Sequence, residues 1–311
     1  MPGAEKEHWS GTVAIDAENA IRLDRYAAEY LKLLSRSQIK ARRLEARVNG
    51  KPAKISRVLR GGEFLELSWP PAPSVELAAE NLPLTVIYED NRVIVINKEQ
   101  GMVVHPGAGN TRGTLVNALL WRRGGPGGEG EGIRPGIVHR LDKDTSGVII
   151  AAWDAAAHEH LAREFALHRV KKTYAALVRG APPASRGKID ARIARSRVNR
   201  KLFAVSGDAG KRAVTFYRLL YAWEGYALLA LRPKTGRTHQ IRVHLRHLGC
   251  PIVGDPLYGA ADRRFPHATL MLHAARLSIV LPGGKTGVFA APLPARFRCL
   301  TRALGKPLPH A

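Results

Sequence analysis

Residues 136–150 read Gly-Ile-Val-His-Arg-Leu-Asp-Lys-Asp-Thr-Ser-Gly-Val-Ile-Ile. A short apolar run leads into a polar loop, and a second apolar run follows the loop. Polar residues between two strands of a rigid scaffold are a frequent place for functional sites. Asp142 stands between Arg140 and Lys143, and a carboxylate near cations stays ionised, so it can act as a nucleophile or a base. The stretch therefore predicts a site between two strands.

Other interpretations of the same loop remain open. Asp144, Thr145 and Ser146 have short polar side chains that bond to nearby backbone, which is typical of turns. Asp142 and Asp144 together resemble part of a metal site, but no third ligand stands near them in the sequence. The pair Asp142-Lys143 resembles phospho-aspartate enzymes, but the Thr-Gly-Thr that should follow is absent.

The composition of the chain points to a polyanionic partner. Its 311 residues suggest two domains, and 45% of them are hydrophobic, which is enough for folded cores. There are 49 Lys and Arg against 26 Asp and Glu, so the formal net charge is +23. Residues 160–242 carry 19 Lys and Arg and 4 Asp and Glu, interleaved with strand-like runs. This pattern predicts a folded domain with a basic surface that meets nucleic acid or an anionic membrane.

Several classes of protein do not fit the sequence. No segment approaches the ~20 apolar residues of a membrane span, and residues 1–10 lack the apolar core of a secretory signal. The two cysteines, Cys250 and Cys299, are far apart and form no C-x-x-C pair. We therefore expect a reduced, cytoplasmic protein with no membrane anchor, no structural zinc and no disulfide framework.

Proline-rich sequence divides the chain. Pro70, Pro71 and Pro73 separate a small N-terminal part from the rest, so we expect an extension over 1–18, a domain over 19–69, a linker over 70–83 and a catalytic domain over 84–311. In the large domain the apolar patterns predict an α+β fold with a mixed, mostly antiparallel sheet. The expected strands are 86–88, 93–97, 148–152, 173–178, 213–220 and 227–231, and the expected helices are 114–121, 154–167 and 238–248.

The N-terminal domain is expected to bind RNA. Apolar residues from Leu23 to Leu31 recur at helical spacing, and Ser35 or Ser37 can cap a second helix starting at Gln38. Asn49-Gly50 is a strong hairpin signal. Basic residues on the second helix and its exit are the expected RNA contacts, namely Arg36, Lys40, Arg43 and Lys51.

Three strings in this domain resemble the alpha-L RNA-binding domain found in a ribosomal protein, tyrosyl-tRNA synthetase and several rRNA-modifying enzymes. They are Leu23-Asp24-Arg25-Tyr26, Ser35-Arg36-Ser37-Gln38-Ile39 and Val48-Asn49-Gly50-Lys51. The resemblance supports an RNA-binding role for residues 19–69.

The stretch His139–Gly147 closely resembles the H-R-L-D-x-x-T-S-G signature of the RluA superfamily of pseudouridine synthases. Further strings in the family's order resemble its other motifs, and the first of them is similar to the RluD branch. They are 101–110, 171–174, 236–244, 251–259, 272–274 and 289–294. The resemblance covers nearly the whole chain and implies the family's α+β catalytic fold.

The resemblance also implies residue roles. The family's nucleophile falls on Asp142, and its tyrosine, which packs against the target base or acts in the final proton removal, falls on Tyr174. The arginine that pairs with the nucleophile falls on Arg242, and the arginine that replaces the flipped base in the RNA falls on Arg140. The family uses no metal and no cofactor. Whether the nucleophile attacks ribose C1′ or uracil C6 stays open.

The function implied is isomerisation of uridine to pseudouridine in 23S rRNA, free or in a pre-ribosomal large subunit, by a monomer. Alternatives are an RluC-like or tRNA-directed synthase, or a non-catalytic ribosome-assembly factor that keeps the fold. Basic residues beside the site are expected to bind RNA, and they are Lys171, Arg195, Arg200, Arg237 and His239.

Overall fold

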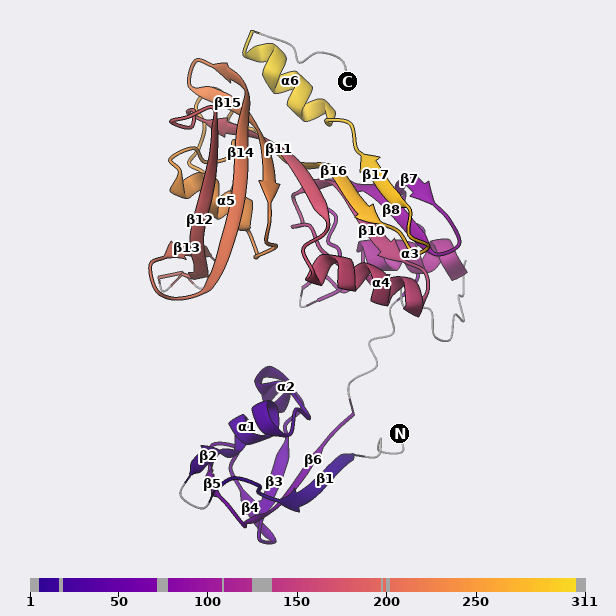
Figure 1. Cartoon of the computed structure of the whole chain (residues 1–311), viewed down its shortest axis with the longest axis vertical. Coiled ribbons are helices and arrows are strands. Elements are labelled where there is room, and N and C mark those ends of the chain that lie inside the picture. The colour runs from indigo at the N-terminus through magenta and orange to yellow at the C-terminus, as the bar shows by residue number, and fades with distance from the viewer. Residues whose placement is uncertain are drawn as a thin grey trace. The chain divides into compact units, whose positions relative to one another are not determined.

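The computed structural model describes residues 6–16, 19–71, 78–107, 109–124, 136–196, 198–199 and 202–305. The chain divides into two compact units, Met1–Glu76 and Leu77–Ala311 (Figure 1). Residues 72–77 of the expected linker lie outside the described ranges. Within those ranges, no helix is long and apolar enough to cross a membrane.

The first unit combines two small sheets with short helical turns around one core. Its four-stranded sheet has the order β1(Glu7–Thr12)-β6(Phe64–Trp69)-β3(Glu45–Val48)-β4(Lys51–Ala53), and β2(Ala20–Arg22) pairs with β5(Val58–Arg60). The helical segments are α1(Leu23–Arg25), a π-helical turn over Tyr26–Tyr30, and α2(Arg36–Ala41). Leu23, Ile39, Leu59 and Leu65 are fully buried in its core.

Local sequence signals explain this unit, with two corrections. Asn49 and Gly50 have φ of 51° and 75° and turn β3 into β4, as expected for this pair. Ser35 accepts from the Gln38 amide at 3.3 Å while the Gln38 side chain accepts from the Ser35 amide, so α2 begins two residues earlier than expected. The strand β1 pairs along its whole length with β6, so residues 7–12 belong to this unit and not to an extension.

The second unit is built on one 11-stranded sheet with the order β13-β12-β14-β15-β11-β16-β10-β8-β7, in which β17 pairs β16 and β9 pairs β10. Helices lie against this sheet, and the arrangement is the expected α+β fold. The strands are β7(Thr85–Glu89), β8(Val93–Lys98), β9(Gly136–Ile137), β10(Ser146–Ala152), β11(Lys171–Arg179), β12(Arg186–Arg195), β13(Phe203–Ser206), β14(Lys211–Trp223), β15(Tyr226–Pro233), β16(Leu272–Val280) and β17(Thr286–Ala290). The helices are α3(Leu115–Gly124), α4(Ala155–Ala166), α5(Gln240–His247) and α6(Ala295–Ala303).

The sheet is joined at its middle by a narrow seam between β10 and β16. This is the parallel pair among the described strands, and it extends over two residue pairs, Ser146 with His273 and Gly147 with Ala274. Ala274 is in turn the partner of Tyr174 on β11. The loop from Arg140 to Thr145 enters β10 at this seam, so the seam fixes where the polar loop lies relative to β11.

A buried polar chain closes the seam. The Arg296 guanidinium donates to the Ser146 hydroxyl at 2.6 Å, and that hydroxyl lies 2.8 Å from Nδ1 of His273. Nε2 of His273 lies 3.3 Å from the carbonyl of Ala291, which accepts its proton. Burial lowers the pKa of His273 to about 4, so the ring is neutral and can accept from Ser146. These contacts connect α6, β10, β16 and the segment after β17.

Gly147 is required at the seam because its φ is +115° and a Cβ would collide with the carbonyl oxygen of Ala274 and lie 2.6 Å from its amide nitrogen. We predict that Gly147→Ala lowers the stability of the catalytic unit by about 2–4 kcal/mol, because backbone must move and the φ is strained. Thermal and urea unfolding measure this loss. Gly207→Ala, where a Cβ meets nothing within 4 Å, is the matched control and should change stability by less than about 1 kcal/mol. Equal effects of the two variants would contradict the role of the seam.

Candidate active site

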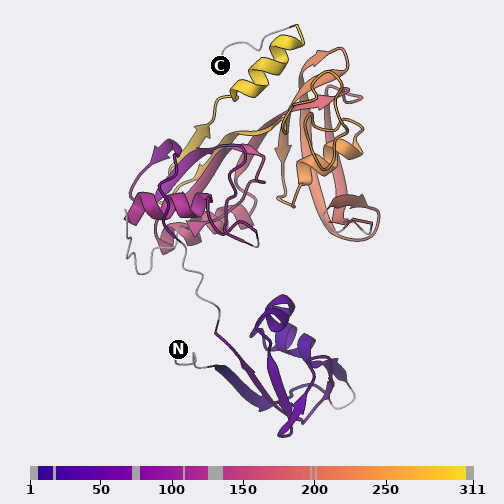
Figure 2. The same ribbon diagram turned by 180° about the vertical axis from the view of Figure 1, so that it is seen from behind.

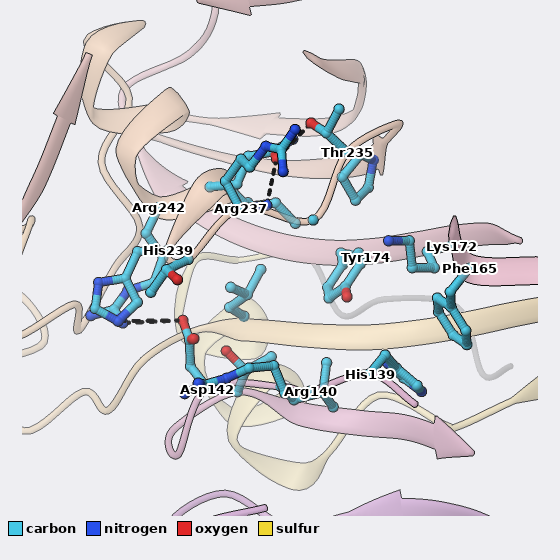
Figure 3. A pocket seen from close by; sticks show the side chains of 18 of the residues that line it. His139, Arg140, Asp142, Phe165, Lys172, Tyr174, Thr235, Arg237, His239 and Arg242 are labelled. Atoms are coloured by element: carbon cyan, nitrogen blue, oxygen red, sulfur yellow. Dashed lines mark hydrogen bonds and ion pairs between the residues drawn. The ribbon is translucent and has the colours of Figure 1, made fainter. Parts of the chain in front are cut away.

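A cavity of about 450 Å³ opens beside the seam. Its walls come from the loop before β10, from α4 and β11, and from the segment that joins β15 to α5 (Figure 3). Residues expected from sequence that line this one cavity are Arg140, Asp142, Tyr174, Arg237, His239 and Arg242. The fold thus brings together residues that lie as much as a hundred positions apart in the chain.

The centre of the site is an ion-pair chain through Arg242. Its Nε and Nη2 donate to the two carboxylate oxygens of Asp255 at 2.8 and 2.7 Å. Its Nη1 donates to Oδ2 of Asp142 at 3.3 Å. The side chains of Asp255 and Arg242 are 0% and 4% exposed, whereas that of Asp142 is 19% exposed. Arg242 is therefore held from behind by Asp255 and offers one N–H to Asp142 at the cavity.

In the ion-pair chain, the opposite charges of Arg242 and its two carboxylate partners stabilise one another. Burial acts to lower the pKa of Arg242, but its hydrogen bonds and the charges of Asp255 and Asp142 raise the pKa overall. Burial acts to raise the pKa of Asp255, but Arg242 and the backbone amides of Leu257 and Tyr258 lower it. Both groups are charged at neutral pH, and the guanidinium is fixed before any substrate arrives.

The polar turn before α5 positions Arg242. The Gln240 side chain donates to the carbonyl of Val214 and the hydroxyl of Thr215, both at 3.0 Å. Its carbonyl oxygen accepts from the Thr235 hydroxyl and the Arg237 amide. One side chain thus joins β14, the turn and the first residue of α5, which limits the movement of the helix that carries Arg242.

His239 lies beside Asp142 and not on an open RNA surface. Its Nδ1 is 2.8 Å from the hydroxyl of Tyr258 and its Nε2 is 3.9 Å from Oδ2 of Asp142. Burial lowers the pKa of His239, so the ring is neutral at neutral pH. Its φ of 54° is unusual for a residue other than glycine, and the turn holds it there.

Lys98 holds the loop of Asp142 through hydrogen bonds to main-chain carbonyls. Its Nζ donates to the carbonyls of Glu99 and Met102 at 2.8 Å and of Lys143 at 3.1 Å. Burial lowers the pKa of Lys98 to about 8, although the charges of Asp144 and Asp142 oppose this. A cation that binds the carbonyl next to Asp142 fixes the main chain of the loop. The sequence analysis missed this residue, although a lysine at the end of the apolar run 93–96 was an available signal.

The opposite wall is aromatic and carries one ammonium. Burial and the nearby charge of Asp142 raise the pKa of Tyr174, so its phenol is protonated at neutral pH. Lys172 lines the cavity with Tyr174, and Lys171, expected from sequence, does not. His139 stacks on Phe165 with centroids 4.5 Å apart and accepts from the Ile150 amide. Burial lowers the pKa of His139 to about 3, so it is a neutral part of the wall.

Comparison with known proteins places the sequence of this unit in one family. The family model described as RNA pseudouridylate synthase matches residues 92–247, which include the cavity residues from Val138 to Arg242. The chain belongs to the RNA pseudouridylate synthase family. It is an isomerase that converts uridine in RNA to pseudouridine.

Relatives of this pseudouridine synthase align over most of its length. It is 44% identical over 288 residues to ribosomal large subunit pseudouridine synthase D of Borreliella burgdorferi, covering 90% of this chain and 88% of that protein. It is 40% identical to the Xanthomonas campestris protein of the same name, covering 94% and 91%. The solved structure of human RNA pseudouridylate synthase domain containing 4 has a TM-score of 0.59 and 28% identity, and the match covers 73% of this chain and 95% of that one.

The other residues expected to bind RNA are not among the described residues that line the cavity of the synthase. Arg195 is exposed, with its guanidinium carbon 5.4 Å from the centroid of the Phe203 ring, and Arg200 lies outside the described residues. In the first unit, Arg36 pairs with Asp24 at 3.3 Å. Lys40, Arg43 and Lys51 are exposed there. Among the residues that the structure describes, no group of three or more His, Cys, Asp or Glu side chains could hold a metal ion.

We predict that Asp255→Asn lowers the single-turnover rate at saturating RNA by about 100-fold, because Arg242 loses the charge that fixes it and Asp142 loses its alignment. Asp262→Asn is the matched control. Asp262 is 7% exposed and accepts from the Tyr226 hydroxyl and two backbone amides, but it is not in the cavity. Both variants should lose about 1–3 kcal/mol of stability. If Asp262→Asn slowed the reaction as much, the rate loss would reflect general loosening of the fold.

Proposed function

We propose that this enzyme modifies uridine in large-subunit (23S) rRNA with Asp142 as its nucleophile. The substrate class is supported by the relatives named ribosomal large subunit pseudouridine synthase D, which this chain matches over about nine-tenths of its length. The observation that carries the catalytic proposal is the contact of the partly exposed Asp142 with Arg242, whose other edge is occupied by Asp255.

The reaction needs a group that holds one half of the substrate while the other turns. The N1–C1′ bond of the uridine breaks, the uracil rotates, and a C5–C1′ bond forms; C5 then loses its proton and N1 gains one. Asp142 contacts Arg242 and borders the cavity, so its Oδ atoms can attack C1′ or C6 and later leave. No redox change occurs, and no residue in this scheme requires a metal or cofactor.

Tyr174 and Arg140 are proposed to bind the displaced base and its surroundings. Tyr174 lies across the cavity from Asp142 (Figure 3), and its raised pKa keeps it a neutral phenol. This favours packing against the uracil over acting as the base that removes the C5 proton. Arg140 is exposed at the cavity, where its planar guanidinium can stack in the gap that a flipped uridine leaves.

Further roles remain proposals of the same kind. The first unit is proposed to be an alpha-L RNA-binding domain whose exposed cations bind rRNA phosphates. A monomer is proposed because Asp142, Tyr174, Arg242 and Asp255 all come from one chain. An rRNA substrate is consistent with a cytoplasmic location. An RluC-like or tRNA-directed synthase and a non-catalytic assembly factor are the competing assignments.

We predict that wild-type enzyme releases tritium from a 23S transcript labelled with [5-³H]-uridine, without added metal and in the presence of a chelator. Asp142→Asn should release none above background, because the amide is not a nucleophile of useful strength. Asp144→Asn, in the same loop but not lining the cavity, is the matched control and should keep activity within about tenfold of wild type.

The outcomes separate the alternatives. Tritium release by the wild-type enzyme from tRNA, but not from 23S transcript or large-subunit particles, would make tRNA the substrate instead of 23S rRNA. If the protein released no tritium from any of these RNAs but bound RNA tightly, a non-catalytic assembly factor would be favoured. Release by Asp142→Asn at the wild-type rate would exclude Asp142 as the nucleophile.

We predict that the double variant Lys40→Glu/Lys51→Glu binds 23S transcript about tenfold or more weakly, with a salt slope reduced by about 2, because phosphate contacts are lost. Single-turnover rates at saturating RNA should stay within about twofold of wild type, since the cavity belongs to the other unit. Lys40→Arg/Lys51→Arg keeps the charge and should bind like wild type. A rate that falls to background at saturating RNA would contradict a role restricted to affinity.

A further inference from the structure

A second hollow lies on the face of the sheet opposite the active site. It has a volume of about 570 Å³ and is lined by β11, β12, β14 and β15. Neighbouring residues of the same strand line different sites. On β11, Tyr174 lines the catalytic cavity and Thr173 lines this hollow; on β15, Pro233 lines the cavity and Arg232 lines the hollow. Because successive side chains on a strand point to opposite faces, the hollow and the cavity are on opposite sides of the sheet.

The surface of the hollow, here called the rear face, is defined by Arg186, Lys188, Phe216, Arg218 and Arg232. In the cross-strand register Lys188 pairs with Phe216, which pairs with Arg232, and Arg186 pairs with Arg218. In Figure 1, β12 and β14 are seen with no helix in front of them, whereas α5 lies behind them; Figure 2 shows the helix from its own side. The rear face is therefore an uncovered sheet surface.

The arrangement of cations on the rear face lowers the stability of the sheet. Arg186 and Arg218 are direct cross-strand partners, and like charges in that position destabilise a sheet. The backbones of Arg186, Arg218 and Arg232 pair in the sheet. Within the described parts of the chain, no hydrogen bond or ion pair engages their side chains. Lys188 differs, because it pairs with Asp190 at 2.8 Å. Three unneutralised guanidinium groups on one small surface fit an anionic partner with several charges, which would relieve their repulsion.

An exposed aromatic ring stands among these cations. Phe216 is 39% exposed at the centre of the row, between Lys188 on one strand and Arg232 on the other. An aromatic ring on an open sheet, flanked by cations, is the arrangement on which unpaired bases stack while their phosphates are held at the sides. A protein partner with acidic side chains would meet the charges but would not need a flat ring at their centre.

We propose that the rear face is a second RNA-binding surface, which binds an unpaired segment of the RNA outside the nucleotide that enters the active site. Phe216 stacks on a base, and Arg186, Arg218 and Arg232 bind neighbouring phosphates. The proposal goes beyond the assignment of the catalytic site and does not depend on which uridine is modified. It places part of the large positive charge of residues 160–242 on a surface with a definite ligand.

The test is filter binding of a 23S transcript at about 150 mM KCl and across a salt series. Arg218→Glu/Arg232→Glu should bind about tenfold or more weakly, and its salt slope should fall by about 2. Phe216→Ser should bind about tenfold more weakly with an unchanged salt slope, because it removes stacking and not charge. Single-turnover rates at saturating RNA should stay near wild type for both variants.

The matched control is Arg123→Glu/Lys285→Glu, which makes the same change in net charge at the end of α3 and in the turn between β16 and β17. Arg218→Lys/Arg232→Lys keeps the charge and should retain most of the affinity if folding is intact. Reversal variants that bind no more weakly than the control variant would overturn the proposal. Normal binding to the naked transcript with lost binding to large-subunit particles would also overturn it, because the rear face would then contact a protein.

Discussion

The active site depends on one buried guanidinium. Arg242 joins Asp142, a hundred residues earlier in the chain, to Asp255, thirteen residues later. Removing a charged group from water costs several kcal/mol unless it is paired, and Asp255 supplies the main partner for Arg242 with two hydrogen bonds. The arginine that Asp255 holds also contacts Asp142, the proposed nucleophile, and so helps to position it.

The two contacts of Arg242 are unequal, and this inequality suits a nucleophile. Asp255 takes two short hydrogen bonds and is fully buried, whereas Asp142 takes one longer bond and remains 19% exposed. A carboxylate engaged as tightly as Asp255 would be a poor nucleophile, because its lone pairs would be occupied. His239 adds no competing charge, since burial lowers its pKa and leaves the ring neutral. The site is thus strongly held at Arg242 and only lightly held at Asp142.

Signals carried by neighbouring residues were readable from the sequence, and pairings between distant residues were not. The Asn49-Gly50 hairpin, the helix α4 and the strand β10 depend on local preferences, and all were predicted. The strand β12 was not expected, because its many charged residues obscure the apolar side that packs inward. The strands β16 and β17 were not expected either. Asp255 lies in a string that was noticed for its resemblance, but its bond to Arg242 requires the folded loop. Lys98 stands at the end of an apolar run, but its partners are backbone carbonyls, so its role could not be predicted from the sequence.

The sequence shows that residues 160–242 are basic, but it does not show which face of the sheet each cation occupies. The alternation of side chains along β11 illustrates this. Lys172 and Tyr174 border the catalytic cavity, whereas Thr173 belongs to the other side of the sheet. A cavity of about 450 Å³ cannot take up the excess charge of residues 160–242, and its central ion-pair chain already contains two carboxylates for one arginine. Most of the cations in that region must therefore lie elsewhere, and the period of two on β12, β14 and β15 puts several on the opposite face. One face of the sheet can thus hold the reacting uridine, while cations on the opposite face attract RNA. Because the two faces use different residues, the requirements of one do not restrict the residues of the other.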